Sequence, residues 1–228
     1  MNRYKDIELI IFDCDGVLVD TEKLANRVFI EEVHKFGFKL TPEEAWEHFP
    51  GSRFITCVEY VESTNGKKMP LEFIDIYKKR SAEVFAAEVM PIPGVTEVLE
   101  KLKLPRVVAS NGPKVTIKAN LITSGLIRFF QEEHLFSAYD IQKWKPEPDM
   151  HLNVSKVLGI HPANCLVIED SVPGAQAAIA AGMPVLGFMH DGRNQKLLSM
   201  DIPKFNDMEE LFQYNFMSQS KSISLSSL

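Results

Sequence analysis

Cysteine is scarce in this sequence, with Cys14, Cys57 and Cys165 as its three thiols among 228 residues. An odd and small number of thiols does not provide the paired framework of disulfide-rich secreted domains, so we expect reduced cysteines and a cytoplasmic location. Long apolar stretches are also missing. No run approaches the ~20 residues of a membrane span, and Met1–Asp6 lacks the apolar core of a signal peptide, so we expect no membrane association.

Positive charge is not in excess either. The 25 lysines and arginines are fewer than the 31 acidic residues, and the formal net charge is −6. Binding to nucleic acid relies on a basic surface, so we expect no nucleic acid as a partner. The six histidines show no pair at the spacing of zinc ligands, which argues against a histidine-based zinc site.

Apolar and β-branched residues fill the segment Leu9–Phe12, which is typical of a strand buried on both faces. Asp13 follows this strand directly and Asp15 lies two residues further, so both carboxylates project to the same side of an extended chain. Gly16 then permits a sharp turn. Two like charges this close cost free energy unless a cation offsets them, and a divalent metal ion is the simplest such cation.

A long segment after this turn, residues 20–89, has the pattern of helices, because charged residues are interleaved with apolar ones at helical spacing. Thr41 followed by Pro42 and two acidic residues is typical of a helix start. Asn65-Gly66 marks a break between two later helices. We therefore predict that residues 20–89 form an all-helical domain inserted after the first strand.

Strands and helices alternate from residue 90 onward. Short apolar runs predict further strands at residues 106–109, 135–138, 165–168 and 184–188. This alternation is typical of a parallel, doubly wound sheet. We predict an α/β fold in which residues 1–19 and 90–216 form a Rossmann-like core, and in which residues 217–228 are a mobile serine-rich tail.

Polar side chains follow two more of these predicted strands. Ser110 and Asn111 follow the strand at 106–109, and Glu169 and Asp170 follow the strand at 165–168. Because parallel strands place their carboxyl ends at one edge of the sheet, we expect these groups to converge there with the aspartates of the first strand. Carboxylates suit Mg²⁺, whereas a hydroxyl and the ammonium of Lys145 suit phosphate oxygens. The combination predicts phosphoryl transfer.

Four short motifs occur in order along the chain: Asp13-x-Asp15-Gly16, Ser110, Lys145-Pro146 and Glu169-Asp170. Together they resemble the four ordered motifs of the haloacid dehalogenase superfamily. The predicted helical insert resembles the cap domain of its β-phosphoglucomutase-like subfamily. The resemblance implies a Mg²⁺-dependent phosphatase or phosphomutase. The sequence leaves the choice between a monomer and a small homo-oligomer open.

The resemblance also implies roles for the acidic residues. Asp13 would attack phosphorus and form an aspartyl-phosphate, and Asp15 would protonate the leaving alcohol and then deprotonate the attacking water. Asp13, the backbone carbonyl of Asp15 and Asp170 would bind Mg²⁺, with Glu169 beside them.

Further residues are implied to hold the substrate. Ser110 and Lys145 would bind the transferring phosphoryl group. Asn111 either offers its backbone amide to phosphate or only forms the turn. In the insert, Gly51-Ser52-Arg53 occupies the loop through which related caps contact the substrate, although a solvated surface role for the arginine is an equal alternative.

Two departures from the family pattern bear on the reaction. The mutases of the subfamily carry a histidine five residues after the position of Asp20, where this sequence has Ala25, and the difference argues for hydrolysis. Trp144 stands where the family more often has glycine, and we expect it to pack. The stretches around the later motifs look closest to bacterial sugar-phosphate phosphatases. The expected substrate is therefore a sugar phosphate or sugar-acid phosphate, with 6-phosphogluconate as a candidate.

Other classes use some of the same residues. A receiver-type signalling module also has a strand-end aspartate, Mg²⁺, a hydroxyl and a lysine, but it lacks an equivalent of Asp15 and a helical insert. Haloalkanoate dehalogenation shares Asp13 but needs neither Asp15 nor Mg²⁺. Cys14 is not expected to be a nucleophile, because a cysteine phosphatase needs an arginine six residues on, where this sequence has Asp20.

Overall fold

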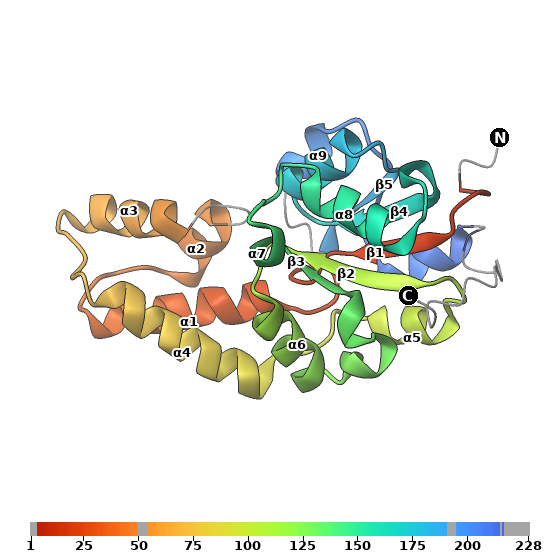
Figure 1. Cartoon of the computed structure of the whole chain (residues 1–228). Helices are drawn as coiled ribbons and strands as arrows, with labels where there is room; N and C mark the ends of the chain where they lie inside the picture. Colours follow the sequence, from red (N-terminus) through yellow and green to blue (C-terminus); the bar gives the residue numbers. More distant parts are fainter. Residues whose placement is uncertain (1–3, 50–53, 191–194, 215, 217–228) are drawn as a thin grey trace.

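Strand β1 (Leu9–Phe12) lies inside a parallel sheet, between β2 and β4, in the computed structural model of the chain (Figure 1). The structure describes residues 4–49, 54–190, 195–214 and 216. The other strands are β2 (Arg106–Ser110), β3 (Leu135–Ser137), β4 (Cys165–Glu169), β5 (Val185–Phe188) and β6 (Lys204–Phe205). Their order is β3-β2-β1-β4-β5-β6, and every neighbouring pair is parallel, which confirms the predicted doubly wound α/β sheet.

Helices cover both faces of the sheet (Figure 1). They are α5 (Val95–Lys101) and α6 (Lys114–Thr123) on one face, and α8 (Asp149–Leu158) and α9 (Val172–Ala180) on the other. Side chains of β1 alternate between the two layers. Ile10 and Phe12 belong to the apolar cluster under the first pair of helices, and Leu9 and Ile11 to the cluster under the second.

Among the strands and α-helices that the structure describes, two short ones were not predicted from the sequence. Strand β6 has two residues and α7 (Ala138–Ile141) has four, so neither shows a periodic pattern. Helix α8 begins at Asp149, three residues after the proline of the Lys145-Pro146 motif. Pro146 and Pro148 explain why the helix does not begin earlier, because the residue before a proline disfavours helical backbone angles.

Four helices between β1 and α5 pack around a separate apolar cluster. They are α1 (Thr21–Lys35), α2 (Pro42–His48), α3 (Phe54–Asn65) and α4 (Phe73–Glu88). The ring of Phe29 lies at its centre, edge-on to Phe49, Phe73 and Tyr77 at centroid distances of 5.4 to 5.6 Å. None of the helices that the structure describes is long and apolar enough to cross a membrane.

The chain enters the helical insert after β1 and returns to the sheet domain before α5, and hydrogen bonds join these two connecting segments side by side. The Asp20 backbone N–H donates to the Met90 carbonyl at 2.9 Å, and the Ile92 N–H donates to the Leu18 carbonyl at 2.9 Å. A third link joins two helices, because the Thr123 hydroxyl of α6 donates to the Ala86 carbonyl of α4 at 3.0 Å. The insert therefore lies beside the segment that follows β1, as Figure 1 shows.

The complete burial of β1 predicts the energetic effect of truncating it. Ile11 is fully buried, so Ile11→Ala should lower the free energy of unfolding by about 2–5 kcal/mol through lost contacts and the cavity left behind. Ile179→Ala is the matched control, because Ile179 is half exposed on α9 and its truncation should cost within about 0.5 kcal/mol. Urea denaturation followed by circular dichroism measures both values, and equal losses would contradict the assignment.

Candidate active site

The carboxyl ends of three adjacent strands meet at one edge of the sheet. Asp13 follows β1, Ser110 ends β2 and Glu169 ends β4. The Asp13 backbone N–H donates to the Ile168 carbonyl at 3.0 Å, which fixes the chain after β1 against the end of β4. A cavity of about 220 Å³ opens there. Its lining includes Asp13, Asp15, Ser110, Asn111, Lys145, Glu169 and Asp170. The structure thus brings together every predicted site residue of the sheet domain.

The ammonium group of Lys145 binds two carboxylates at the base of this cavity. Its Nζ donates to Asp13 Oδ1 and to Glu169 Oε2, the latter at 2.7 Å. All three side chains are buried. Burial by itself would lower the pKa of Lys145, but the charges of Asp13 and Glu169 raise it above its ordinary value. Lys145 is therefore a permanent cation held between two motifs that are distant in the sequence.

The Glu169 carboxylate is held as an anion by its own turn. Its Oε1 accepts hydrogen bonds from the Asp170 N–H, the Ser171 N–H and the Ser171 hydroxyl, at 2.8 to 3.1 Å. Burial acts to raise the pKa of Glu169, yet the charge of Lys145 and these hydrogen bonds lower it below its ordinary value. Space around the carboxylate is tight, because a Cβ at Gly174 would lie 1.9 Å from Glu169 Oε2.

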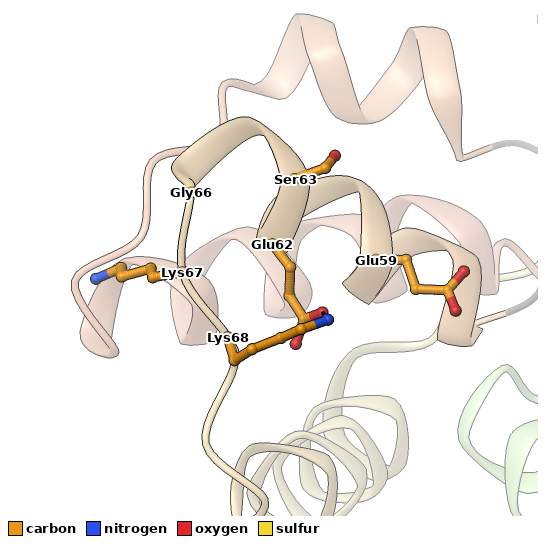
Figure 2. Close-up of a pocket in the computed structure, with 6 residues that line it drawn as sticks. All are labelled: Glu59, Glu62, Ser63, Gly66, Lys67 and Lys68. Carbon is orange, nitrogen blue, oxygen red and sulfur yellow. Dashed lines mark hydrogen bonds and ion pairs between the residues drawn. The ribbon is translucent and has the colours of Figure 1, made fainter.

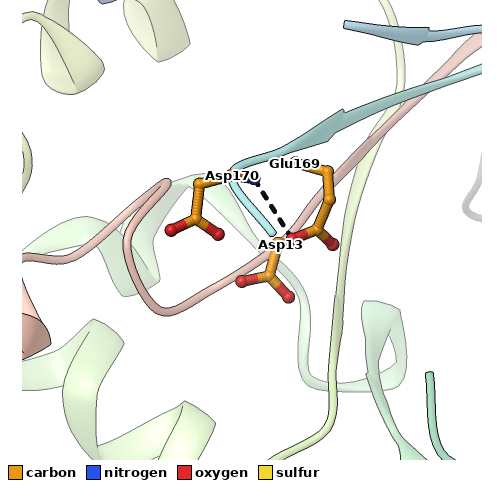
Figure 3. A group of neighbouring side chains, drawn as sticks. All are labelled: Asp13, Glu169 and Asp170. Atoms are coloured by element: carbon orange, nitrogen blue, oxygen red, sulfur yellow. Dashed lines mark hydrogen bonds between the residues drawn. The ribbon is translucent and has the colours of Figure 1, made fainter. Parts of the chain in front are cut away.

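Three buried carboxylates gather next to Lys145. Figure 3 shows Asp13, Glu169 and Asp170 turned toward a common point, and one oxygen from each lies within 4.8 Å of the others. Burial raises the pKa of Asp13 and of Asp170, and the charge of Glu169 raises both further. Three carboxylates whose oxygens lie this close together form an all-oxygen cluster of the kind that suits a hard divalent cation.

Asp15 is held apart from this cluster. Its Oδ1 accepts hydrogen bonds from the Thr21 hydroxyl at 3.0 Å and from the Asn120 amide at 3.4 Å. Burial raises the pKa of Asp15 above its ordinary value, although the Thr21 hydroxyl, the charge of Lys145 and further hydrogen bonds from Ser110 and Asn120 act to lower it. The metal contact predicted for Asp15 would be made by its backbone carbonyl. The cluster of side-chain carboxylates therefore gives no evidence for or against that contact.

The loop after β2 supports the lysine. The Asn111 side-chain carbonyl accepts a hydrogen bond from the Lys145 backbone N–H at 2.9 Å, and the Ser110 hydroxyl accepts one from the Gly112 N–H at 3.0 Å. Asn111 thus orients the chain at Lys145, a role that the sequence analysis did not assign to it. No local pattern could have revealed this role, because the two residues are 34 positions apart.

Some predicted features lie elsewhere. Gly51, Ser52 and Arg53 are outside the described residues, so their predicted contact with substrate stays a prediction. Trp144 packs edge-on against Tyr139 at a centroid distance of 5.6 Å and does not line the cavity. Cys14 is buried, and burial together with the charge of Asp15 raises the pKa of its thiol well above the ordinary value, which does not favour a nucleophile.

A second cavity, of about 260 Å³, lies on the helical insert at the end of α3 (Figure 2). Both of its lysines are bound to groups of the insert itself. Lys68 contacts the Glu62 carboxylate at 2.6 Å, and the Lys67 ammonium donates to the Gly37 carbonyl at 3.0 Å. Although it is larger, this cavity lacks the cluster of buried carboxylates that lines the cavity at the strand ends, and the latter is therefore the candidate active site.

Comparisons with known proteins agree with this geometry. Residues 10–188 match the family described as haloacid dehalogenase-like hydrolase. The chain is similar to the 6-phosphogluconate phosphatase of Escherichia coli K12, at 32% identity over 206 residues, which is 90% of this chain and 93% of that protein.

Solved structures show the same likeness. A haloacid dehalogenase-like protein from Agrobacterium tumefaciens C58 superposes with a TM-score of 0.82 at 32% identity, covering 91% of this chain and 96% of that one. A hydrolase of the same family from Deinococcus radiodurans R1, with bound phosphate and sodium, superposes with a TM-score of 0.80 at 28% identity, covering 90% and 93%.

The buried lysine yields a prediction about stability without metal. Lys145→Met should lower the free energy of unfolding by about 3–5 kcal/mol, because it leaves Asp13 and Glu169 buried without their cation. Lys143→Met, an exposed change in the same loop, is the control. Urea denaturation in the presence of a chelator measures both, and equal losses would count against the role of the ion pairs.

The same variant has an expected pH dependence. In the wild type, Lys145 holds the pKa of Glu169 below its ordinary value. The ion pair therefore contributes fully to folding stability when the pH is above the ordinary pKa of a glutamate. This contribution is lost as the pH falls through the lowered pKa of Glu169. The difference in stability between wild type and Lys145→Met should therefore shrink in acid.

Proposed function

Because the chain belongs to the family of haloacid dehalogenase-like hydrolases, we propose that it is a Mg²⁺-dependent phosphatase of a small phosphorylated metabolite. Family membership confirms the resemblance of the four motifs. The observation that carries the proposal is the buried Asp13 carboxylate at the base of the cavity, in contact with Lys145 and beside two further carboxylates.

Asp13 is the proposed nucleophile. Its position at the end of β1 is fixed by the sheet, and Lys145 offsets the repulsion between its carboxylate and a phosphate dianion. Attack on phosphorus forms an aspartyl-phosphate, and Asp15 supplies the proton that the leaving alcohol needs. Asp15 then takes a proton from the water that hydrolyses the intermediate.

The metal and phosphate contacts are proposed from the same geometry. Asp13 and Asp170, with the backbone carbonyl of Asp15, would hold Mg²⁺, and Glu169 would stand beside them while it binds Lys145. Bound Mg²⁺ would supply Lewis-acid stabilisation of the phosphate oxygens. Ser110, Lys145 and the backbone amide of Asn111 would bind the transferring group, since all three residues line the cavity.

Hydrolysis is favoured over phosphoryl transfer between sugar positions. Ala25 lies in α1, where the mutases of the subfamily carry histidine, and its methyl group cannot assist a proton transfer. A phosphomutase is the second candidate, because it would use the same aspartates. A receiver-type signalling module is not supported, since the family match to hydrolases spans most of the chain.

The proposed substrate is a sugar phosphate or sugar-acid phosphate. The similarity to a phosphatase named for 6-phosphogluconate makes this sugar acid the first candidate. Residues 20–89 are the proposed cap domain over the strand ends. Residues 1–19 and 90–216 form the proposed catalytic domain. The proposed location of the enzyme is the cytoplasm. In this arrangement the cap would exclude bulk water from the reacting groups.

Phosphate release from a panel of phosphorylated metabolites tests the proposed function. We expect Mg²⁺-dependent release from at least one sugar phosphate or sugar-acid phosphate. Release should stop when a chelator is added, because the Lewis acid that stabilises the phosphate oxygens is then removed. A colorimetric phosphate assay is the measurement. Lack of release from every compound would contradict the proposal, and isomer interconversion faster than release would favour the mutase.

Substitution of the nucleophile tests the mechanism. Asp13→Asn should abolish turnover, because an amide does not form the aspartyl-phosphate, while the similar shape keeps the fold. Asp15→Ala should instead accumulate a phosphorylated protein from an activated donor, which intact-mass spectrometry detects. Residual Asp13→Asn activity within about tenfold of wild type, a change of only about 1.4 kcal/mol in barrier, would exclude nucleophilic attack by Asp13.

A further inference from the structure

A buried amide from another part of the chain contacts the Asp15 carboxylate. Asn120 lies on α6, 105 positions after Asp15, and its side chain is 2% exposed. Its Nδ2 lies 3.4 Å from Asp15 Oδ1, the oxygen that also accepts the Thr21 hydroxyl hydrogen bond at 3.0 Å. Two donors from different elements thus converge on one carboxylate oxygen.

The location of Asn120 is unusual for a polar side chain. Its neighbours in α6, Ile117 and Leu121, are buried in the apolar cluster under the sheet. A buried amide in such a place costs free energy unless it forms hydrogen bonds, so a leucine would be expected for packing alone. The partner found by Asn120 is the carboxylate to which the proposed function assigns proton transfer.

We propose that Asn120 is a positioning residue that, together with Thr21, holds Asp15 Oδ1 and leaves Oδ2 as the oxygen that exchanges protons. This inference rests on the proposed function. The N–H₂ group of an amide can donate a hydrogen bond but cannot accept one. A proton on Asp15 Oδ1 would therefore point at the hydrogens of Asn120 without an acceptor. The protonated form of Asp15 consequently carries its proton on Oδ2.

The proton balance of both steps follows. As the bond from phosphorus to Asp13 forms and the bond to the substrate oxygen breaks, the proton on Asp15 Oδ2 moves to that leaving oxygen. When water attacks, the bond from phosphorus to Asp13 breaks and a proton of the water moves to Oδ2. Oδ1 keeps its two donors throughout, so the carboxylate need not turn between the steps.

The two donors come from the two parts of the molecule. Thr21 is the first residue of α1 in the helical insert, whereas Asn120 belongs to a helix that covers the sheet. The contact from Asn120 therefore ties Asp15 to the sheet side of the site, where Asp13 and Lys145 lie. A proton-transfer group that must serve two consecutive steps benefits from such a fixed support.

Steady-state and burst kinetics of Asn120→Leu test the inference. Leucine has a similar size but no donor, so kcat for an alkyl phosphate substrate should fall about tenfold without a rise in KM, as for the loss of one hydrogen bond to a charged group. With p-nitrophenyl phosphate, whose leaving group departs without a proton, the variant should release about one equivalent of nitrophenolate per enzyme rapidly and then turn over slowly.

The control is Thr123→Val, which removes another hydrogen bond of α6 without touching Asp15 and should keep kcat within about twofold. Crystal structures of Asn120→Leu and Asn120→Ala give a readout that does not depend on activity, and we expect a rotated Asp15 carboxylate in both. An unchanged Asp15 in those crystals, a kcat loss equal to that of the control, or absence of the burst would overturn the inference.

The outcomes separate the inference from the function on which it rests. If the wild-type protein hydrolyses a phosphate ester and Asn120→Leu does so with an unchanged kcat, the inference about Asn120 is overturned and the proposed function stands. A wild-type protein without Mg²⁺-dependent turnover of any phosphate ester overturns the proposed function and the role of Asn120 in it together.

Discussion

The arrangement of the site depends on one buried ammonium group, Lys145 Nζ, between the carboxylates of Asp13 and Glu169. These two acids end neighbouring parallel strands, so their side chains face the same edge and would repel each other without a cation. The lysine reaches them from a loop that the Asn111 side chain holds through the Lys145 backbone. The ion pairs therefore link three motifs of the sequence. Removal of the Lys145 ammonium group would leave the carboxylates of Asp13 and Glu169 buried without it.

A third carboxylate lies beside this pair of acids. Asp170 joins the two acids bound by Lys145, and burial with the charge of Glu169 raises its pKa. A cluster of this kind costs folding free energy in the absence of a divalent cation, and the same cost becomes affinity when a cation binds. The second aspartate of the first motif avoids this cluster, since Asp15 is held by Thr21 and Asn120. The proposed metal-binding and proton-transfer roles thus fall on different carboxylates, Asp13 and Asp15, that lie only two residues apart.

The fold creates this separation from simple local rules. Alternation along β1 sends Ile10 and Phe12 to one apolar layer and Leu9 and Ile11 to the other, so a shift of the strand by one residue would move each side chain into the opposite layer. The register places Asp13 at the strand end. Gly16, with a φ of 82°, then turns the chain so closely past Asp170 that a Cβ there would lie 2.2 Å from its Oδ2.

Local sequence determined much of this protein. Short apolar runs predicted the five strands from β1 to β5, because apolar side chains on both faces are the main requirement of a buried parallel strand. The polar residues after β1, β2 and β4 predicted one shared edge. The short strand β6 and the short helix α7 lacked enough residues for any periodicity. Only the tertiary structure decided which groups touch: the pairing of Lys145 with two acids, the support of Lys145 by Asn111, and the contact of Asn120 with Asp15. These contacts join residues 24 to 132 positions apart, and a side-chain hydrogen bond at such separation leaves no periodic trace in a single sequence.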